Sequence, residues 1–195
     1  MRTQTRPPVI FLDIDGVLQP HTASDRFTQD LKALRDRFTH ELDPGYATLD
    51  PYDIGAVHHD WHPEAVGHLK QLCELTGARI VVSSNWREGR TRERLLLLFR
   101  LQGLDELIDD VTPSLPLSPR DEEIAAWLAA HPEVDRFVIL DDYFVDRLTN
   151  RFGGRFIYCK WHLGPEEYAR ALQVLALPAG DLPRHDVVEA EPFPW

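Results

Sequence analysis

Residues 11–18 read Phe11-Leu12-Asp13-Ile14-Asp15-Gly16-Val17-Leu18, an apolar run followed by two aspartates and a glycine. In a strand, residues two apart face the same side. If the strand ends here, the carboxylates of Asp13 and Asp15 meet, and each raises the pKa of the other. Gly16 allows the backbone to turn sharply out of the sheet. Such an arrangement costs stability and is useful for chemistry, so the segment predicts a reactive strand end.

The composition limits what surrounds this segment. The chain has 195 residues, which is enough for one domain with a buried core and a small insertion. Its 43% hydrophobic and 27% charged residues are typical of a globular protein. A formal net charge of −11 argues against a protein that coats nucleic acid or an anionic membrane, although it allows a local basic patch.

The two cysteines, Cys73 and Cys159, are far apart and form neither a disulfide framework nor a zinc-ligand spacing. We therefore expect a reducing, cytoplasmic environment. Residues 1–8 are polar and lack the apolar core of a signal peptide. Because no run approaches the roughly 18 apolar residues of a membrane helix, we expect no membrane partner. Oligomeric state leaves no signal in the sequence.

Apolar runs alternate with amphipathic segments along the chain. Strands are expected at 9–12, 79–82, 107–111, 137–140 and 156–158, and helices at 25–42, 63–76, 91–102, 120–130 and after 164. This alternation predicts one α/β domain, a three-layer Rossmann-like fold with a mostly parallel five-stranded sheet.

Two segments fall outside that alternation. Residues 19–60 are expected to be a small cap-like insertion whose helix, 25–42, buries Phe27, Leu31, Leu34 and Phe38. Its second part, 43–60, is rich in Pro, Gly and Asp and is expected to be a loop or a small lid. The acidic, Pro-rich tail at 178–195 is expected to be irregular.

Polar residues cluster where the predicted strands end, and the site of such a sheet lies beyond the carboxyl ends of its strands. Four converging acids repel one another unless a cation is present, and oxygen ligands alone favour a hard ion such as Mg²⁺. The strand-end residues are Asp13 and Asp15, Ser83 and Ser84, and Asp141 and Asp142.

These residue types suit phosphoryl transfer. A carboxylate such as Asp13 can attack phosphorus and form an aspartyl-phosphate. Asp15 can protonate the leaving oxygen and then activate water. A hydroxyl from Ser84 and the cation of Arg120 can bind the phosphoryl oxygens.

The motifs resemble those of the haloacid dehalogenase (HAD) superfamily, specifically its phosphatase branch. Its first motif, an apolar strand followed by Asp-x-Asp-Gly-x-Leu, matches residues 11–18. The resemblance implies that Asp13 is the nucleophile and that Asp15 is the general acid and base, with a main-chain carbonyl offered to Mg²⁺. The fourth motif, paired acids after a strand, implies that Asp141 and Asp142 hold the ion directly or through water.

The second and third motifs are less specific. We favour Ser84 for the second because Ser-Asn resembles the commoner Thr-Asn, and Ser83 is the alternative. Arg120, at the start of a predicted helix, matches the third, where Lys is commoner. Lys160 follows the fourth motif, so its order is wrong. The remaining residues expected to bind substrate are Gly16, Ser83, Asn85 and Arg87.

An acid two residues after the nucleophile is kept by phosphatases and phosphomutases and is absent from haloacid dehalogenases, which narrows the implied chemistry. The sequence thus predicts a Mg²⁺-dependent phosphomonoester hydrolase. The alternatives are a phosphomutase of the same superfamily and a non-catalytic binding module. A short insertion leaves the site fairly open, which admits a large substrate such as a nucleic-acid end or a phosphoprotein, whereas a closed lid would favour a small metabolite. The expected partner is therefore a phosphorylated substrate, either a small molecule or a nucleic-acid end.

Residues 61–66 and the turn from Ser84 to Arg87 also resemble, more loosely, bacterial HAD domains found in RNA-repair proteins. Other features carry two interpretations. His58, His59 and His62 suggest a metal site or a polar loop. Trp61 and Trp86 can stack on a base, but packing is the expected role. Four arginines can grip a phosphorylated backbone or form a solvated helix face: Arg87, Arg90, Arg92 and Arg94.

Overall fold

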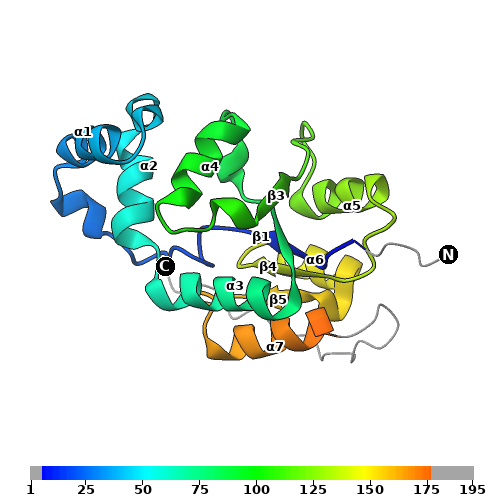
Figure 1. Cartoon of the computed structure of the whole chain (residues 1–195). Coiled ribbons are helices and arrows are strands. Elements are labelled where there is room, and N and C mark those ends of the chain that lie inside the picture. The colour runs from blue at the N-terminus through cyan, green and yellow to red at the C-terminus, as the bar shows by residue number, and fades with distance from the viewer. Residues whose placement is uncertain (1–5, 177–195) are drawn as a thin grey trace.

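A five-stranded parallel sheet forms the centre of the molecule (Figure 1). The computed structural model describes residues 6–176, so the tail predicted at 178–195 lies outside the described part. The strands stand in the order β3-β2-β1-β4-β5. This topology confirms the predicted Rossmann-like α/β fold. The strands are β1 (Val9–Leu12), β2 (Arg79–Val82), β3 (Ile108–Val111), β4 (Phe137–Asp141) and β5 (Phe156–Tyr158).

Strand β1 is apolar throughout because helices cover both faces of the sheet. All four of its residues are buried. Alternation sends Ile10 and Leu12 into the larger core cluster and Val9 and Phe11 into the smaller one on the other face. The ring of Phe11 meets Trp127 edge to face, with centroids 5.3 Å apart.

The helices form the outer layers. On one face, α3 (Pro63–Thr76) and α7 (Pro165–Ala176) lie side by side below the sheet in Figure 1. On the other face, α5 (Arg120–Ala130) and α6 (Val145–Phe152) contribute to the smaller core cluster. Short helices η4 (Asn85–Arg87), η5 (Asp105–Leu107) and η6 (Gly153–Arg155) lie in the connections, and α4 (Arg92–Arg100) follows η4.

The helix predicted at 25–42 is wrong in its first part. The segment divides into η1 (Asp25–Thr28) and α1 (Leu31–Glu41), because Asp30 caps α1 by accepting a 3.0 Å hydrogen bond from the backbone N–H of Ala33. Phe27, expected to be buried, is consequently 63% exposed. The other residues predicted on that face, from Leu31 to Phe38, are buried as expected.

The segment 43–60 is helical, which corrects the expected loop. It forms η2 (Pro44–Thr48), α2 (Pro51–Gly55) and η3 (Ala56–Asp60). The first two begin at an Asp-Pro pair, where Asp43 or Asp50 accepts a backbone hydrogen bond and the proline occupies the first turn. The Asp-Pro pairs are helix starts and not loop signals.

The insertion packs against α4 and the segment that follows it, beside which α1 and α2 lie in Figure 1. Tyr46, fully buried, donates its hydroxyl to the carbonyl of Leu97 at 2.9 Å. Gln102 donates to the carbonyl of Val57 at 2.6 Å. These bonds fix the insertion on the core in this structure, and action as a lid remains a prediction.

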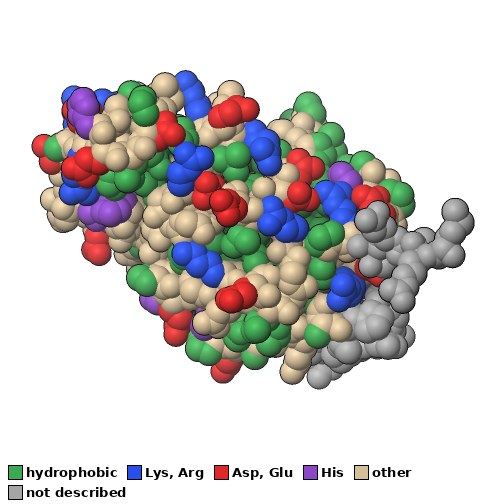
Figure 2. Space-filling view, in the orientation of Figure 1, with side chains coloured by type: hydrophobic (Ala, Val, Ile, Leu, Met, Phe, Trp, Pro, Cys, Tyr) green, Lys and Arg blue, Asp and Glu red, His purple; other side chains and the backbone are tan. Residues whose placement is uncertain are grey.

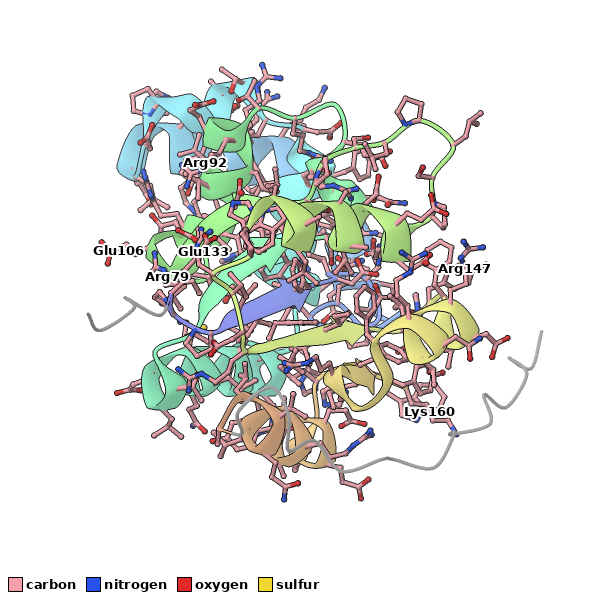
Figure 3. The ribbon with its side chains drawn as sticks, turned by 90° about the vertical axis from the view of Figure 1, so that its right-hand side faces the viewer. Arg79, Arg92, Glu106, Glu133, Arg147 and Lys160 are labelled. Atoms are coloured by element: carbon pink, nitrogen blue, oxygen red, sulfur yellow. The ribbon has the colours of Figure 1, made fainter. Side chains whose placement is uncertain are left out.

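The sheet has one edge at which chemistry can gather. In Figure 3, β1 runs away from Arg79, at the start of β2, and toward the side of Arg147, near the start of α6. The carboxyl ends of the strands therefore share one edge, where a parallel sheet places its site. Within residues 6–176, no helix has the length and apolar character needed to cross a membrane.

Candidate active site

Strand register brings the predicted site residues level with one another. Leu12 pairs with Val82 of β2 and Leu140 of β4. The residues that follow these three are Asp13, Ser83 and Asp141. Alternation assigns all three to the sheet face that α5 covers. Backbone bonds from Asp13 N–H to Leu140 O at 3.0 Å and from Ser83 N–H to Leu12 O at 2.9 Å hold the ends together.

Asp13 is buried and held at both carboxylate oxygens. Oδ1 accepts a hydrogen bond from the backbone N–H of Ile14 at 2.8 Å. Oδ2 accepts one from Nη1 of Arg120, and the same nitrogen donates to Oδ2 of Asp141 at 2.6 Å. One guanidinium therefore orients two carboxylates from neighbouring strands.

Arg120, the residue predicted to match the third motif, lies beside the two carboxylates. It is the first residue of α5 and is buried. Burial lowers its pKa, but Asp141 and Asp13 more than compensate and hold the pKa above its ordinary value, so the side chain stays charged. Nη2 also donates to Oδ1 of Asn85 at 3.2 Å. Lys160, the other basic candidate, is exposed in the segment that follows β5 (Figure 3).

The acids at the end of β4 carry more negative charge than Arg120 balances. Burial and the nearby Asp13 raise the pKa of Asp141 to about 7, although Arg120 opposes the shift. Burial also raises the pKa of Asp142. Without a further cation, these surroundings favour the protonated form of both carboxyl groups. Additional positive charge would favour the ionised form.

The arrangement of the acids fits a metal ion. Asp13, Asp141 and Asp142 each offer a carboxylate oxygen, and these atoms lie within 4.8 Å of one another. An all-oxygen, carboxylate-rich donor set suits a hard divalent cation. Burial is the main cause of the raised pKa values of Asp141 and Asp142, and the negative charge of Asp13 adds to it. A bound cation would favour the ionised form of both carboxyl groups.

Asp15 is not part of this carboxylate group. Its Oδ2 accepts a 2.9 Å hydrogen bond from Nε1 of Trp86 in η4. Burial raises the pKa of Asp15, and the bond from Trp86 lowers it. The expectation that Trp86 serves packing missed this contact. An indole N–H that is partly buried needs an acceptor, which is the signal that could have found it.

Gly16 is required by the close approach of the two strand ends. Its φ is +73°, and a Cβ at this position would lie 2.2 Å from Cγ of Asp142. Only glycine combines the left-handed backbone with that proximity. The turn predicted after the two aspartates is thus present, and it sets Asp142 against the backbone of the first motif.

Ser83 and Ser84 differ in their surroundings. Ser84 is the N-cap of η4, and its Oγ accepts a 3.4 Å hydrogen bond from the N–H of Trp86. The Oγ of Ser83 is buried and has no hydrogen-bond partner among residues 6–176. Because Ser83 also shares the level and face of Asp13, its hydroxyl is the better candidate to meet a phosphoryl oxygen. The sequence had favoured Ser84.

Arg87, predicted to bind substrate, is occupied by contacts within the protein. Its buried guanidinium donates to the carbonyls of Ser83 at 2.6 Å, Ser84 at 2.8 Å and Thr112 at 3.1 Å. It also pairs with buried Glu123 of α5. These partners use its planar donor set, so Arg87 shapes the loop that carries both serines.

His21 is a site residue that the sequence did not reveal. It lies in the segment after β1, and its Nε2 is 2.5 Å from Oδ2 of Asp142. This contact lowers the pKa of Asp142 against the effect of burial. No motif or spacing marks His21 in the chain, because the contact depends on how the insertion leaves the sheet.

The family of HAD domains in Swiss Army Knife RNA repair proteins matches residues 9–168. The match extends from β1 into α7 and includes every candidate site residue described above. The chain belongs to this family. No curated protein and no solved structure matches the chain. Membership of the HAD superfamily supports a phosphatase-type function in general, and the site geometry can be interpreted on that basis.

Proposed function

We propose that this HAD domain is a Mg²⁺-dependent phosphomonoester hydrolase that acts through an aspartyl-phosphate on Asp13. The observation that carries the proposal is the carboxylate of Asp13, held by Ile14 N–H and Arg120 within 4.8 Å of ligand oxygens from Asp141 and Asp142. A carboxylate fixed in this way needs little reorganisation before it attacks phosphorus.

In the first step, a carboxylate oxygen of Asp13 forms a bond to phosphorus while the bond from phosphorus to the ester oxygen breaks. The ester oxygen takes a proton from Asp15, whose raised pKa favours the protonated carboxyl. In the second step, Asp15 accepts a proton from water as the water oxygen attacks phosphorus. The aspartyl-phosphate bond then breaks, which releases inorganic phosphate and restores Asp13.

The other residues orient and balance charge. Asp13, Asp141 and Asp142 would hold Mg²⁺, which when bound supplies positive charge to the phosphoryl oxygens. Arg120 keeps Asp13 and Asp141 in place through one nitrogen. The hydroxyl of Ser83, which has no other partner among the described residues, would donate to a phosphoryl oxygen.

For the substrate, we propose the terminal phosphate of a nucleic acid. The name of the family places related domains in RNA repair proteins. The net charge of −11 suits recognition of a strand end better than of a long phosphate backbone. Figure 2 shows the face opposite the carboxyl edge of the sheet, where basic and acidic side chains are interspersed. A phosphorylated metabolite is the alternative.

Hydrolysis of p-nitrophenyl phosphate, with Mg²⁺ and with EDTA, tests the reaction. We expect activity with Mg²⁺ that falls on the order of 10³-fold or more in Asp13→Asn, and no fall in Asp36→Asn, an exposed acid on α1. Stoichiometric beryllofluoride labelling should disappear in Asp13→Asn. Absence of activity, with Asp13→Asn equal to the parent, would sink the enzyme proposal and favour a binding module.

A substrate panel then tests the substrate class. It contains 3′- and 5′-phosphorylated oligonucleotides, nucleotides and phosphorylated metabolites, assayed by release of inorganic phosphate. Preference for oligonucleotide ends supports the proposal, and preference for a metabolite contradicts it. Transfer of the phosphate to an acceptor without its release would identify a phosphomutase.

A further inference from the structure

A second group of metal-ligating side chains lies outside the candidate active site. His62 precedes α3, Glu64 is in the first turn of α3, and His162 is in the loop before α7. Each offers one ligand atom, and the three atoms lie within 4.8 Å of one another. The packing of α3 beside α7 brings together residues that are about one hundred positions apart in the chain.

The three side chains are in direct contact with one another. The rings of His62 and His162 stack with centroids 4.2 Å apart, and Nε2 of His162 is 3.2 Å from Oε2 of Glu64. Nδ1 of His62 is buried and has no hydrogen-bond partner among residues 6–176. A buried nitrogen without a partner costs free energy, and an ion bound at Nδ1 would supply that partner.

We propose that His62, Glu64 and His162 bind a divalent transition-metal ion of the Zn²⁺ class. Two imidazoles and one carboxylate form a donor set that Zn²⁺ favours, whereas Mg²⁺ favours oxygen donors alone. The three side chains are half-buried or exposed, so water can complete the coordination. The chain would thus hold different ions at two separate sites.

The position of this site gives the ion a structural consequence. The N–H of His62 donates to the carbonyl of Leu18 at 2.7 Å, and the N–H of Leu163 donates to the carbonyl of Val17 at 2.9 Å. The ligand segments therefore hold the turn that follows Asp15 and Gly16 from two sides. An ion that joins His62 to His162 would fix these segments relative to each other.

Two of the three histidines grouped in the sequence lie outside this site. His58 and His59 contact each other, with ring centroids 4.6 Å apart, and His58 also meets the ring of Phe38. Of the three predicted together, only His62 belongs to the group found here. Glu64 and His162 become visible as partners only when the fold is known.

Calorimetric titration of the untagged full-length protein with Zn²⁺, in excess Mg²⁺, tests the proposal. We expect one Zn²⁺ equivalent that weakens at least about tenfold in His162→Ala and in Glu64→Gln. The control is His40→Ala, which removes an exposed histidine on α1 and should leave the affinity unchanged. Circular dichroism checks that each variant is folded.

Two further arms separate this site from the acidic one. The same equivalent should remain in Asp13→Asn, since Asp13 belongs to the other group. Co²⁺ in place of Zn²⁺ should give the absorption of a nitrogen-ligated ion, and His162→Ala should abolish it. Zn²⁺ binding that is lost in Asp13→Asn, or that is unchanged in both His162→Ala and Glu64→Gln, would overturn the proposal, whatever the hydrolase assay shows.

Discussion

Nε1 of Trp86 donates a 2.9 Å hydrogen bond to Oδ2 of Asp15. This bond connects the loop after β2 to Asp15, the proposed proton-transfer residue after β1. Because burial raises the pKa of Asp15 and this bond lowers it, Trp86 limits how tightly Asp15 holds its proton. Changing this contact should therefore change the pH dependence of the proposed reaction.

Trp86→Phe keeps an aromatic ring and removes the N–H, so the pKa of Asp15 should rise further. Asp15 must be protonated when the ester bond breaks, so the alkaline limb of kcat/KM should move to higher pH. A hydrogen bond to a charged group contributes about 1.5–3 kcal/mol, which corresponds to a shift of about one pH unit or more. The measurement is the pH profile of p-nitrophenyl phosphate hydrolysis at saturating Mg²⁺.

Trp127→Phe is the matched control for this change. Trp127 makes an equivalent indole bond of 2.7 Å to Asp110, away from the carboxylate group. Its removal should leave the pH limb in place. Equal profiles for Trp86→Phe and Trp127→Phe would show that the Trp86 bond does not tune the reaction.

The two serines after β2 should separate in function. Ser83→Ala removes a buried hydroxyl without another partner in the described chain, and kcat/KM should fall on the order of 10²-fold. Ser84→Ala removes the N-cap of η4 and should cost about 1 kcal/mol of stability with a smaller effect on kcat/KM. Steady-state kinetics and urea unfolding of both variants measure these effects. A larger fall in kcat/KM for Ser84→Ala than for Ser83→Ala would identify Ser84 as the phosphoryl ligand.

Gly16→Ala should disrupt the site beyond the cost of its backbone. The added Cβ would lie 2.2 Å from Cγ of Asp142, so the carboxylate must move and Mg²⁺-dependent hydrolysis should be largely lost. Gly77→Ala is the control, because Gly77 has φ +70° with open space around its Cβ position. Both variants carry roughly 1–2 kcal/mol of strain from the left-handed backbone. If both lose hydrolysis equally, the contact with Asp142 is not the cause of the loss.

Arg120→Met leaves Asp13 and Asp141 buried without their shared cation. Breaking such a buried pair costs about 3–5 kcal/mol, so the metal-free protein should unfold at markedly lower urea. Mg²⁺ should reduce this deficit, since it supplies charge at the same carboxylates. Arg147→Met removes a half-exposed arginine (Figure 3) and leaves Arg151 paired with buried Asp121 at 2.9 Å, so it should change stability much less. If Mg²⁺ does not reduce the loss of stability in Arg120→Met, then Arg120 and Mg²⁺ do not balance the same carboxylates.

The sequence was sufficient for the sheet and for the acids at its edge, because both follow from local patterns. Apolar runs mark buried strands, and Asp13 and Asp141 follow those runs directly. The loop predicted at residues 43–60 is wrong because Asp and Pro also begin helices, as they do at Asp43 and Asp50. Local composition does not distinguish these two uses.

Other features depend on tertiary geometry. Choosing between Ser83 and Ser84 requires the register of β2, since a shift of one residue reverses the face. Arg87 resembles the other arginines of its segment until its carbonyl partners are known. His21 reaches Asp142 from 121 positions away, a distance that no periodicity encodes.

The stabilisation by Mg²⁺ should increase with pH. The pKa of Asp141 in the metal-free fold is about 7, above the roughly 3.9 of an unfolded aspartate. Its favourable contribution is therefore complete below about pH 4 and is lost as the pH rises through about 7. Asp142 shifts in the same direction. Mg²⁺ requires ionised ligands, so it replaces the lost protons at higher pH.

Thermal unfolding with saturating Mg²⁺ and with EDTA measures this linkage. The increase in Tm due to Mg²⁺ should be larger at about pH 8 than at about pH 5.5, because protons compete at low pH. Ionisable groups remote from the carboxylates titrate alike in both arms and cancel. Asp142→Asn should reduce the increase at both pH values, whereas Asp36→Asn, an exposed acid on α1, should not. An increase that is independent of pH, or retained in Asp142→Asn, would show that Mg²⁺ does not bind at this group of acids.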